Sequence, residues 1–173
     1  GGGSWYSGGM VTVNGGVVNA NGNNGGAGIG GGGSNVGGSG GTVTINGGTF
    51  TSVGDDCVEV CEDAALTING GTFKTEADDY DAVYMGSGAT VTINDGTFTA
   101  TGDGRNALYL SVGATAVLGG GVFEGSPAIG AENNDFSGIT FKGIYIPSPA
   151  RWQTANRVEI ILGEAVAKIG DTG

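Results

Sequence analysis

The sequence predicts an all-β fold, a right-handed parallel β-helix (β-solenoid) with three short strands in each rung of 23–25 residues. Three observations predict it. A phrase of the form Thr-Val-Thr-Ile-Asn-Gly-Gly-Thr-Phe recurs, its copies lie 23 to 25 residues apart, and apolar and polar residues alternate within each copy. Such a repeat holds one structural unit that buries its apolar face only by stacking on its neighbours. We expect about five or six rungs, spaced about 4.8 Å apart.

The phrase supplies the first two strands of each rung. Its full copies cover 42–50, 65–73, 90–98 and 115–123, with a degenerate copy at 11–18 and a weak one at 139–146. In the second full copy, Leu66 and Ile68 face one side and Thr67 faces the other, as period-2 alternation requires. Asn-Gly-Gly then turns the chain, because Asn and Gly tolerate positive φ. An antiparallel sandwich also has short strands, but it does not predict identical residues at this spacing.

Stacking of the rungs predicts columns of identical side chains. The Phe column contains Phe50, Phe73, Phe98 and Phe123, and the Asn column contains Asn14, Asn46, Asn69 and Asn94. The Phe rings should fill a narrow core, and the Asn amides should bond up and down one corner. A third strand of each rung is expected at 58–60, 83–85 and 108–110.

The two ends of the sequence depart from the repeat. Residues 22–41 are rich in Gly and predict a long loop within the solenoid domain, which we place at 1–146. Residues 147–173 are expected to form a C-terminal cap or a linker to a following module, because Pro147 and Pro149 break strand pairing. Within 151–170 the apolar pattern fits a strand at 157–162 and also fits a helix.

Composition and charge exclude several classes of function. The chain has 17 acidic and 6 basic residues, a net charge of −11, and no His. Without His there is no Ser-His-Asp triad, no Cys-His nucleophile and no His-ligated zinc or haem. The negative charge argues against nucleic acid as a partner, because phosphates need Lys and Arg. The sequence has no run of about 18 apolar residues, so no membrane insertion is expected.

Acidic residues gather at one corner of successive rungs. The candidate metal ligands are Asp55, Asp56, Asp78, Asp79 and Asp103. Carboxylates stacked about 4.8 Å apart repel one another, so either their pKa values rise or a cation lies between them. Oxygen ligands without His favour Ca²⁺. A solvated acidic edge that keeps a Gly-rich rod soluble explains the same residues, and both interpretations stay open.

The outward side of the third strands carries the candidate ligand-binding residues. If Val83 and Leu108 face inward, Tyr84 and Tyr109 face outward in one column, with Glu59 in the preceding rung. Tyr rings beside a carboxylate suit sugars, whose CH faces stack on the ring and whose hydroxyls bond to acids. Tyr is also a common residue of half-exposed strands, so a purely structural role remains an alternative.

Three segments carry a resemblance to a known family. They are the recurring Thr-Val-Thr-Ile-Asn-Gly-Gly-Thr-Phe phrase, the Gly-rich run at 26–33 and the tail at 165–173. Together they resemble the large, repeat-bearing cell-surface proteins of Gram-positive gut bacteria, whose pectate-lyase-like β-solenoid regions are often labelled carbohydrate-binding. The resemblance implies a secreted or cell-surface location, a fragment of a larger extracellular protein, and a glycan partner.

A second, local resemblance lies at 54–57. Gly54-Asp-Asp-Cys57 is similar to a stretch of polygalacturonases, in which paired Asp residues act in hydrolysis beside another Asp and a His. Asp55 and Asp56 match by position, but the chain has no His to complete the set. Arg105, close to Asp103, gives a different enzyme hypothesis, because calcium-dependent pectate lyases pair acidic Ca²⁺ ligands with an Arg or Lys base.

Taken together, the residues and the resemblance predict a non-catalytic extracellular module that binds a polysaccharide or a cell-surface glycan, as an adhesin does, with Ca²⁺ as a candidate cofactor. One alternative is a structural spacer or filament subunit, whose open rung ends self-associate end to end. A second alternative is a calcium-dependent polysaccharide lyase with Arg105 as the base.

Overall fold

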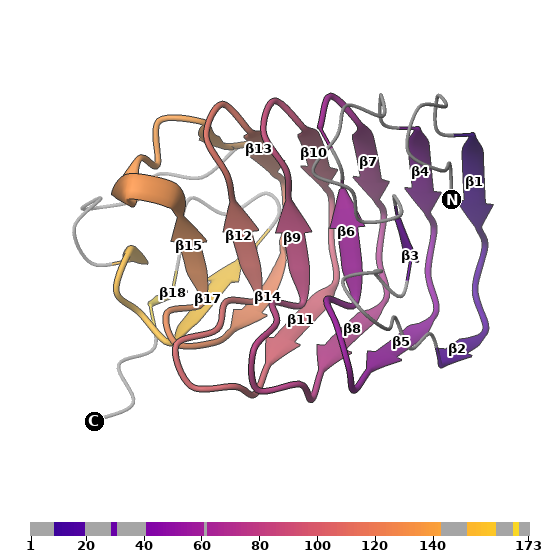
Figure 1. The fold of residues 1–173 in the computed structure, drawn as a ribbon, viewed down its shortest axis with the longest axis horizontal. Helices are drawn as coiled ribbons and strands as arrows, with labels where there is room; N and C mark the ends of the chain where they lie inside the picture. The colour runs from indigo at the N-terminus through magenta and orange to yellow at the C-terminus, as the bar shows by residue number, and fades with distance from the viewer. Residues whose placement is uncertain are drawn as a thin grey trace.

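A computed structural model describes residues 9–19, 29–30, 41–60, 62–142, 152–161 and 168–169. The chain winds through three β-sheets, and each rung gives one strand to each sheet (Figure 1). The first sheet contains β1 (Met10–Val13), β4 (Thr42–Ile45), β7 (Ala65–Ile68), β10 (Thr90–Ile93), β13 (Thr115–Leu118) and β16 (Ile139–Phe141). The second contains β2 (Val17–Asn19), β5 (Thr49–Ser52), β8 (Thr72–Thr75), β11 (Thr97–Ala100), β14 (Gly121–Glu124), β17 (Arg157–Ile160) and β18 (Lys168–Ile169). The third contains β3 (Ile29–Gly30), β6 (Val58–Val60), β9 (Val83–Met85), β12 (Leu108–Leu110) and β15 (Ile129–Ala131).

The predicted β-solenoid is confirmed by this arrangement. Strands of successive rungs pair in parallel, and the residues that pair are those that the repeat aligns, such as Ile45 with Ile68 and Ile68 with Ile93. The handedness of the winding and the number of rungs stay predictions. A short helical segment, η1 (Glu132–Asn134), follows β15, and among the described residues no helix is long and apolar enough to cross a membrane.

The Phe column forms the centre of the core. The rings of Phe50, Phe73, Phe98 and Phe123 stack nearly parallel, with successive ring centroids 4.8, 4.9 and 4.9 Å apart. This spacing equals the distance between hydrogen-bonded strands, so the backbone register places one ring directly on the next. All four rings are buried, together with Ile45, Leu66, Ile68, Ile93 and Leu118 of the first sheet. The predicted burial of Phe73 between Phe50 and Phe98 is therefore confirmed.

The Asn column joins the rungs at the corner between the first and second sheets. Asn46 donates a side-chain hydrogen bond to Asn14 (2.8 Å), Asn69 donates to Asn46 (2.8 Å), and Asn94 donates to Asn69 (2.7 Å). The second glycine of the later Asn-Gly-Gly corners is required by packing as well as by conformation. At Gly71, φ is +122° and a Cβ atom would lie 2.9 Å from the carbonyl oxygen of the preceding rung. The Asn-Gly-Gly corner is thus specified by the sequence, as predicted.

The last described segment packs on the C-terminal end of the solenoid. β17 pairs antiparallel with β14, and Trp152 contacts Phe136 and Phe141 edge-to-face at 5.1 and 5.2 Å between centroids. Of the two alternatives for this region, a strand is observed at 157–160. Most of the predicted Gly-rich loop at 22–41 lies outside the described residues, as do parts of 147–173.

Replacing Phe73 tests the core. Because its ring is fully buried between two others, Phe73→Ala should leave a cavity and lower the free energy of unfolding by about 3–5 kcal/mol. Thr72→Ala, one residue away on the exposed side of the same strand, should change it by less than about 0.5 kcal/mol. Urea unfolding followed by circular dichroism measures both, and equal effects would contradict the core assignment.

Candidate functional site

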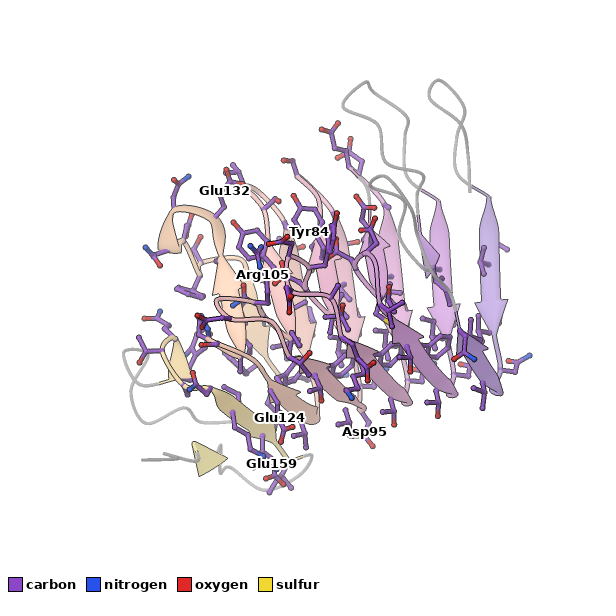
Figure 2. The ribbon with its side chains drawn as sticks, turned by 60° about the horizontal axis from the view of Figure 1, so that its bottom comes forward. Tyr84, Asp95, Arg105, Glu124, Glu132 and Glu159 are labelled. Carbon is purple, nitrogen blue, oxygen red and sulfur yellow. The ribbon has the colours of Figure 1, made fainter. Side chains whose placement is uncertain are left out.

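A polar groove of about 370 Å³ lies on the outer flank of the third sheet. Its lining comes from β9, β12, the corners that precede them and η1. The lining residues are Asp81, Tyr84, Gly104, Arg105, Asn106, Tyr109, Ser111 and Glu132. Figure 2 shows Tyr84, Arg105 and Glu132 close together on one side of the solenoid, with Asp95, Glu124 and Glu159 on another side. Residues from successive rungs therefore converge on one surface.

The predicted outward column of the third sheet is present in the structure. Glu59 pairs with Tyr84, and Tyr84 pairs with Tyr109, while the residues on either side of each are buried. The two Tyr rings are nearly parallel, at 10°, with centroids 5.7 Å apart. They are half-buried rather than fully exposed, and this spacing leaves no room for a ligand between them. A ligand would therefore have to contact an outer face or an edge of the pair.

Gly130 ends the aromatic column. It pairs with Tyr109 in the next strand, β15, so the position that would carry a third ring has no side chain. A Cβ atom on Gly130 would lie 2.5 Å from Oδ1 of Asn106, whose side chain occupies that space and donates a hydrogen bond to the carbonyl oxygen of Pro127 (2.6 Å). The face of Tyr109 directed toward β15 therefore borders polar groove residues instead of another ring.

Hydrogen bonds between successive rungs hold the polar lining in place. The Ser111 hydroxyl donates to the Tyr84 hydroxyl oxygen at 2.9 Å, and Glu132 accepts a bond from the backbone N–H of Val112 at 3.1 Å. Arg105 lies 3.7 Å from the carboxylate of Asp79, which is 84% exposed, so this ion pair is weak. The Nε atom of Arg105 is buried and has no hydrogen-bond partner among the described residues.

Two buried Asp residues on successive rungs, Asp56 and Asp81, form a column that reaches the groove at Asp81. Asp56 accepts a hydrogen bond from the backbone N–H of Asp81 (2.7 Å), and Asp81 accepts one from the backbone N–H of Asn106 (2.6 Å). The repeat spacing of 23 residues predicts Asp79 opposite Asp56, and this prediction is wrong, because Asp81 lies there instead. The corner between β8 and β9 is two residues longer than the corner between β5 and β6, so Asp81 takes that position. Sequence reasoning missed Asp81 and Asn106 for this reason.

Burial changes the protonation of this column. The pKa of Asp56 is raised to about 8, mainly by burial; the hydrogen bond from Asp81 opposes the shift, and the carboxylates of Asp81, Asp55 and Glu59 add to it. Burial also raises the pKa of Asp81, to about 6, against the hydrogen bond from Asn106 and the nearby charge of Arg105. In the folded protein at neutral pH, Asp56 is therefore protonated and Asp81 is largely ionised.

The five candidate metal ligands do not share one environment. Asp55 and Asp56 are buried, whereas Asp78, Asp79 and Asp103 are exposed. Asp55 uses one carboxylate oxygen to accept the backbone N–H of Asp56 (2.8 Å), and its other oxygen is buried without a partner in the described region. Across the described ranges, no three His, Cys, Asp or Glu side chains are grouped so that they could hold a metal ion. Calcium binding stays a prediction.

Comparisons with protein-family models, with curated proteins and with solved structures found no match to the chain.

The buried column predicts a pH-dependent stability. A carboxyl group whose pKa is raised on folding stabilises the folded state at low pH, and this contribution is lost as the pH rises through the raised value. The loss should run from about pH 4 to about pH 6 for Asp81, and from about pH 4 to about pH 8 for Asp56. The urea midpoint should therefore fall between about pH 4 and about pH 8 and level off above about pH 8.

Asp56→Asn should remove the upper part of this dependence, because Asn keeps the acceptor oxygen and cannot ionise. The chain already has Asn106 in the same column. Asp78→Asn, at an exposed corner position, is the matched control and should leave the pH profile unchanged. A flat wild-type profile, or an equal effect of both substitutions, would contradict the assignment.

Proposed function

We propose that this chain is an extracellular, non-catalytic module that binds glycans in the groove beside Tyr84 and Tyr109. The observation that supports the proposal most is the pair of parallel Tyr rings in the lining of a polar groove. Gly130 follows Tyr109 in the column, so no third ring covers the pair on that side, and the side chain of Asn106, itself a groove residue, lies there instead. The extracellular location rests on the resemblance of the repeat phrases to surface proteins.

The chemistry of the groove matches that of a sugar. A pyranose has CH groups that pack on an aromatic face and hydroxyl groups that both donate and accept hydrogen bonds. Arg105 supplies donors, Asp81 and Glu132 supply acceptors, and the hydroxyl of Ser111 can do both. A volume of about 370 Å³ lies at the small end of the usual range for small-molecule sites. A short stretch of a glycan chain suits it better than a large ligand.

The charge of the molecule favours neutral glycans. The net charge is −11, and the groove itself places two carboxylates beside its one cation, Arg105. A polyuronate would be repelled over the length of the solenoid, whereas a neutral polysaccharide would not. The lyase alternative needs carboxylates that share a cation near Arg105, and the described part of the chain supplies no such group. Binding without catalysis is therefore the function that the groove supports best.

A screen of neutral and acidic oligosaccharides, run in Ca²⁺ and repeated in EDTA, tests the proposal. We expect binding to neutral members, and Tyr109→Ala should weaken it at least tenfold, which corresponds to about 1.4 kcal/mol. Tyr80→Ala is the matched control, because Tyr80 is also half-buried but does not line the groove. Calorimetry on a neutral hit then gives the affinities.

Three outcomes would contradict the proposal. The first is no binding to any oligosaccharide, which favours the structural-spacer alternative. The second is an equal effect of the two Tyr substitutions, which places the ligand elsewhere. The third is a preference for polyuronates with release of unsaturated products, which favours the lyase.

A further inference from the structure

The two ends of the solenoid are built differently. At the C-terminal end, β17 pairs with the edge of β14, and Trp152 packs on Phe136 and Phe141. At the N-terminal end, β1 and β2 are the terminal strands of their sheets in the described part of the chain, and β1 lies at the end of the rod in Figure 1. An edge strand presents backbone N–H and C=O groups that can pair with another strand.

The backbone register shows which groups of β1 are directed outward. Thr42 and Asn46 donate backbone hydrogen bonds to the carbonyl oxygens of Gly9 and Val13. Successive residues of a strand direct their N–H and C=O groups to opposite sides. Those of Met10 and Thr12 are therefore directed away from β4, toward the open edge.

At two outward positions of the N-terminal rung, the side chain is apolar where the next rung has Thr. Met10 pairs with Thr42, and Val17 pairs with Thr49, so the first rung has apolar residues where the next has outward Thr. Met10 is 85% exposed and Val17 is 76% exposed. Native edge strands usually carry a charge, a Pro or a bulge that prevents pairing, and residues 9–19 contain neither a charged residue nor a Pro.

Charge separates this end from the rest of the molecule. The first charged residue in the sequence is Asp55, so the strands before it are uncharged although the chain carries a net charge of −11. Two copies repel each other over their later rungs and can approach at the N-terminal end without that repulsion.

We propose that two copies of this chain associate end to end, with β1 of one copy pairing antiparallel with β1 of the other about a two-fold axis. The β14–β17 pair shows that a terminal strand of this solenoid accepts an antiparallel partner. A two-fold contact of this kind uses the same strand of both copies, so the product is a closed dimer rather than a filament. The six strands of the first sheet then continue across the interface.

Sedimentation velocity of the full chain over a range of concentrations tests the proposal. We expect a reversible monomer–dimer equilibrium that higher salt strengthens, because salt screens the repulsion between the charged rungs. Thr12→Lys should raise the dimer dissociation constant at least tenfold, since it places like charges opposite each other in the paired strands. Thr140→Lys is the matched control: Thr140 is also exposed, and it follows the same outward column at the opposite end of the first sheet.

A second variant guards against a compensating rearrangement of the long Lys side chain. Thr12→Pro removes an N–H group directed to the open edge and leaves the bonds from β4 in place. It should also abolish the dimer, with an unchanged circular dichroism spectrum. The proposal is overturned by a monomer at every concentration, by equal effects of Thr12→Lys and Thr140→Lys, or by species that grow beyond a dimer. The groove beside Tyr84 and Tyr109 is formed by later rungs. None of these results therefore depends on glycan binding.

Discussion

Parallel hydrogen bonding between successive rungs, in a single register, is the interaction on which the rest of this structure depends. It sets the distance between strands, and that distance is also the separation of the stacked Phe rings, 4.8 to 4.9 Å. Any residue type that tolerates a copy of itself at that distance can form a column. Phe, Ile and Asn do so, because rings and alkyl groups pack and each Asn amide both donates and accepts.

Ionised carboxyl groups repel one another at this spacing, so they cannot stack as the rings and amides do. Two ionised Asp side chains cannot bond to each other, so Asp56 and Asp81 each accept a backbone N–H from the following rung instead. Burial then favours the protonated form of Asp56, and the column ends in Asn106, which offers the same acceptor without a charge. The acidic residues that remain exposed, such as Asp78 and Asp103, are hydrated and need no such arrangement.

The parts of the structure that could be predicted from the sequence are those that the repeat controls. Phe73 and Asn69 were placed correctly, because strands and Asn-Gly-Gly corners have a constant length. Asp56 was matched with the wrong partner, because the corner before the third sheet varies in length and no periodic signal fixes it. Glu132 was missed because it lies in η1, outside the repeating positions. Ser111 was missed although it occupies a repeating position, because the equivalent residue in the preceding rung is Gly86, which has no side chain. The end of the Tyr column could have been predicted, because Gly130 takes the position that follows Tyr84 and Tyr109 in the repeat.

The variable corner between the second and third sheets separates two properties of the molecule. Its residues lie outside the strands, so its length changes between rungs while the Phe column continues undisturbed. Yet this corner contributes Gly104, Arg105 and Asn106 to the groove. Substitutions at its exposed positions, such as Asp103, would alter what the surface contacts and leave the buried Asp56, Asp81 and Asn106 column in place. The corner is thus the place where descendants of this sequence, or an engineer using it as a scaffold, could acquire a new specificity on an unchanged core.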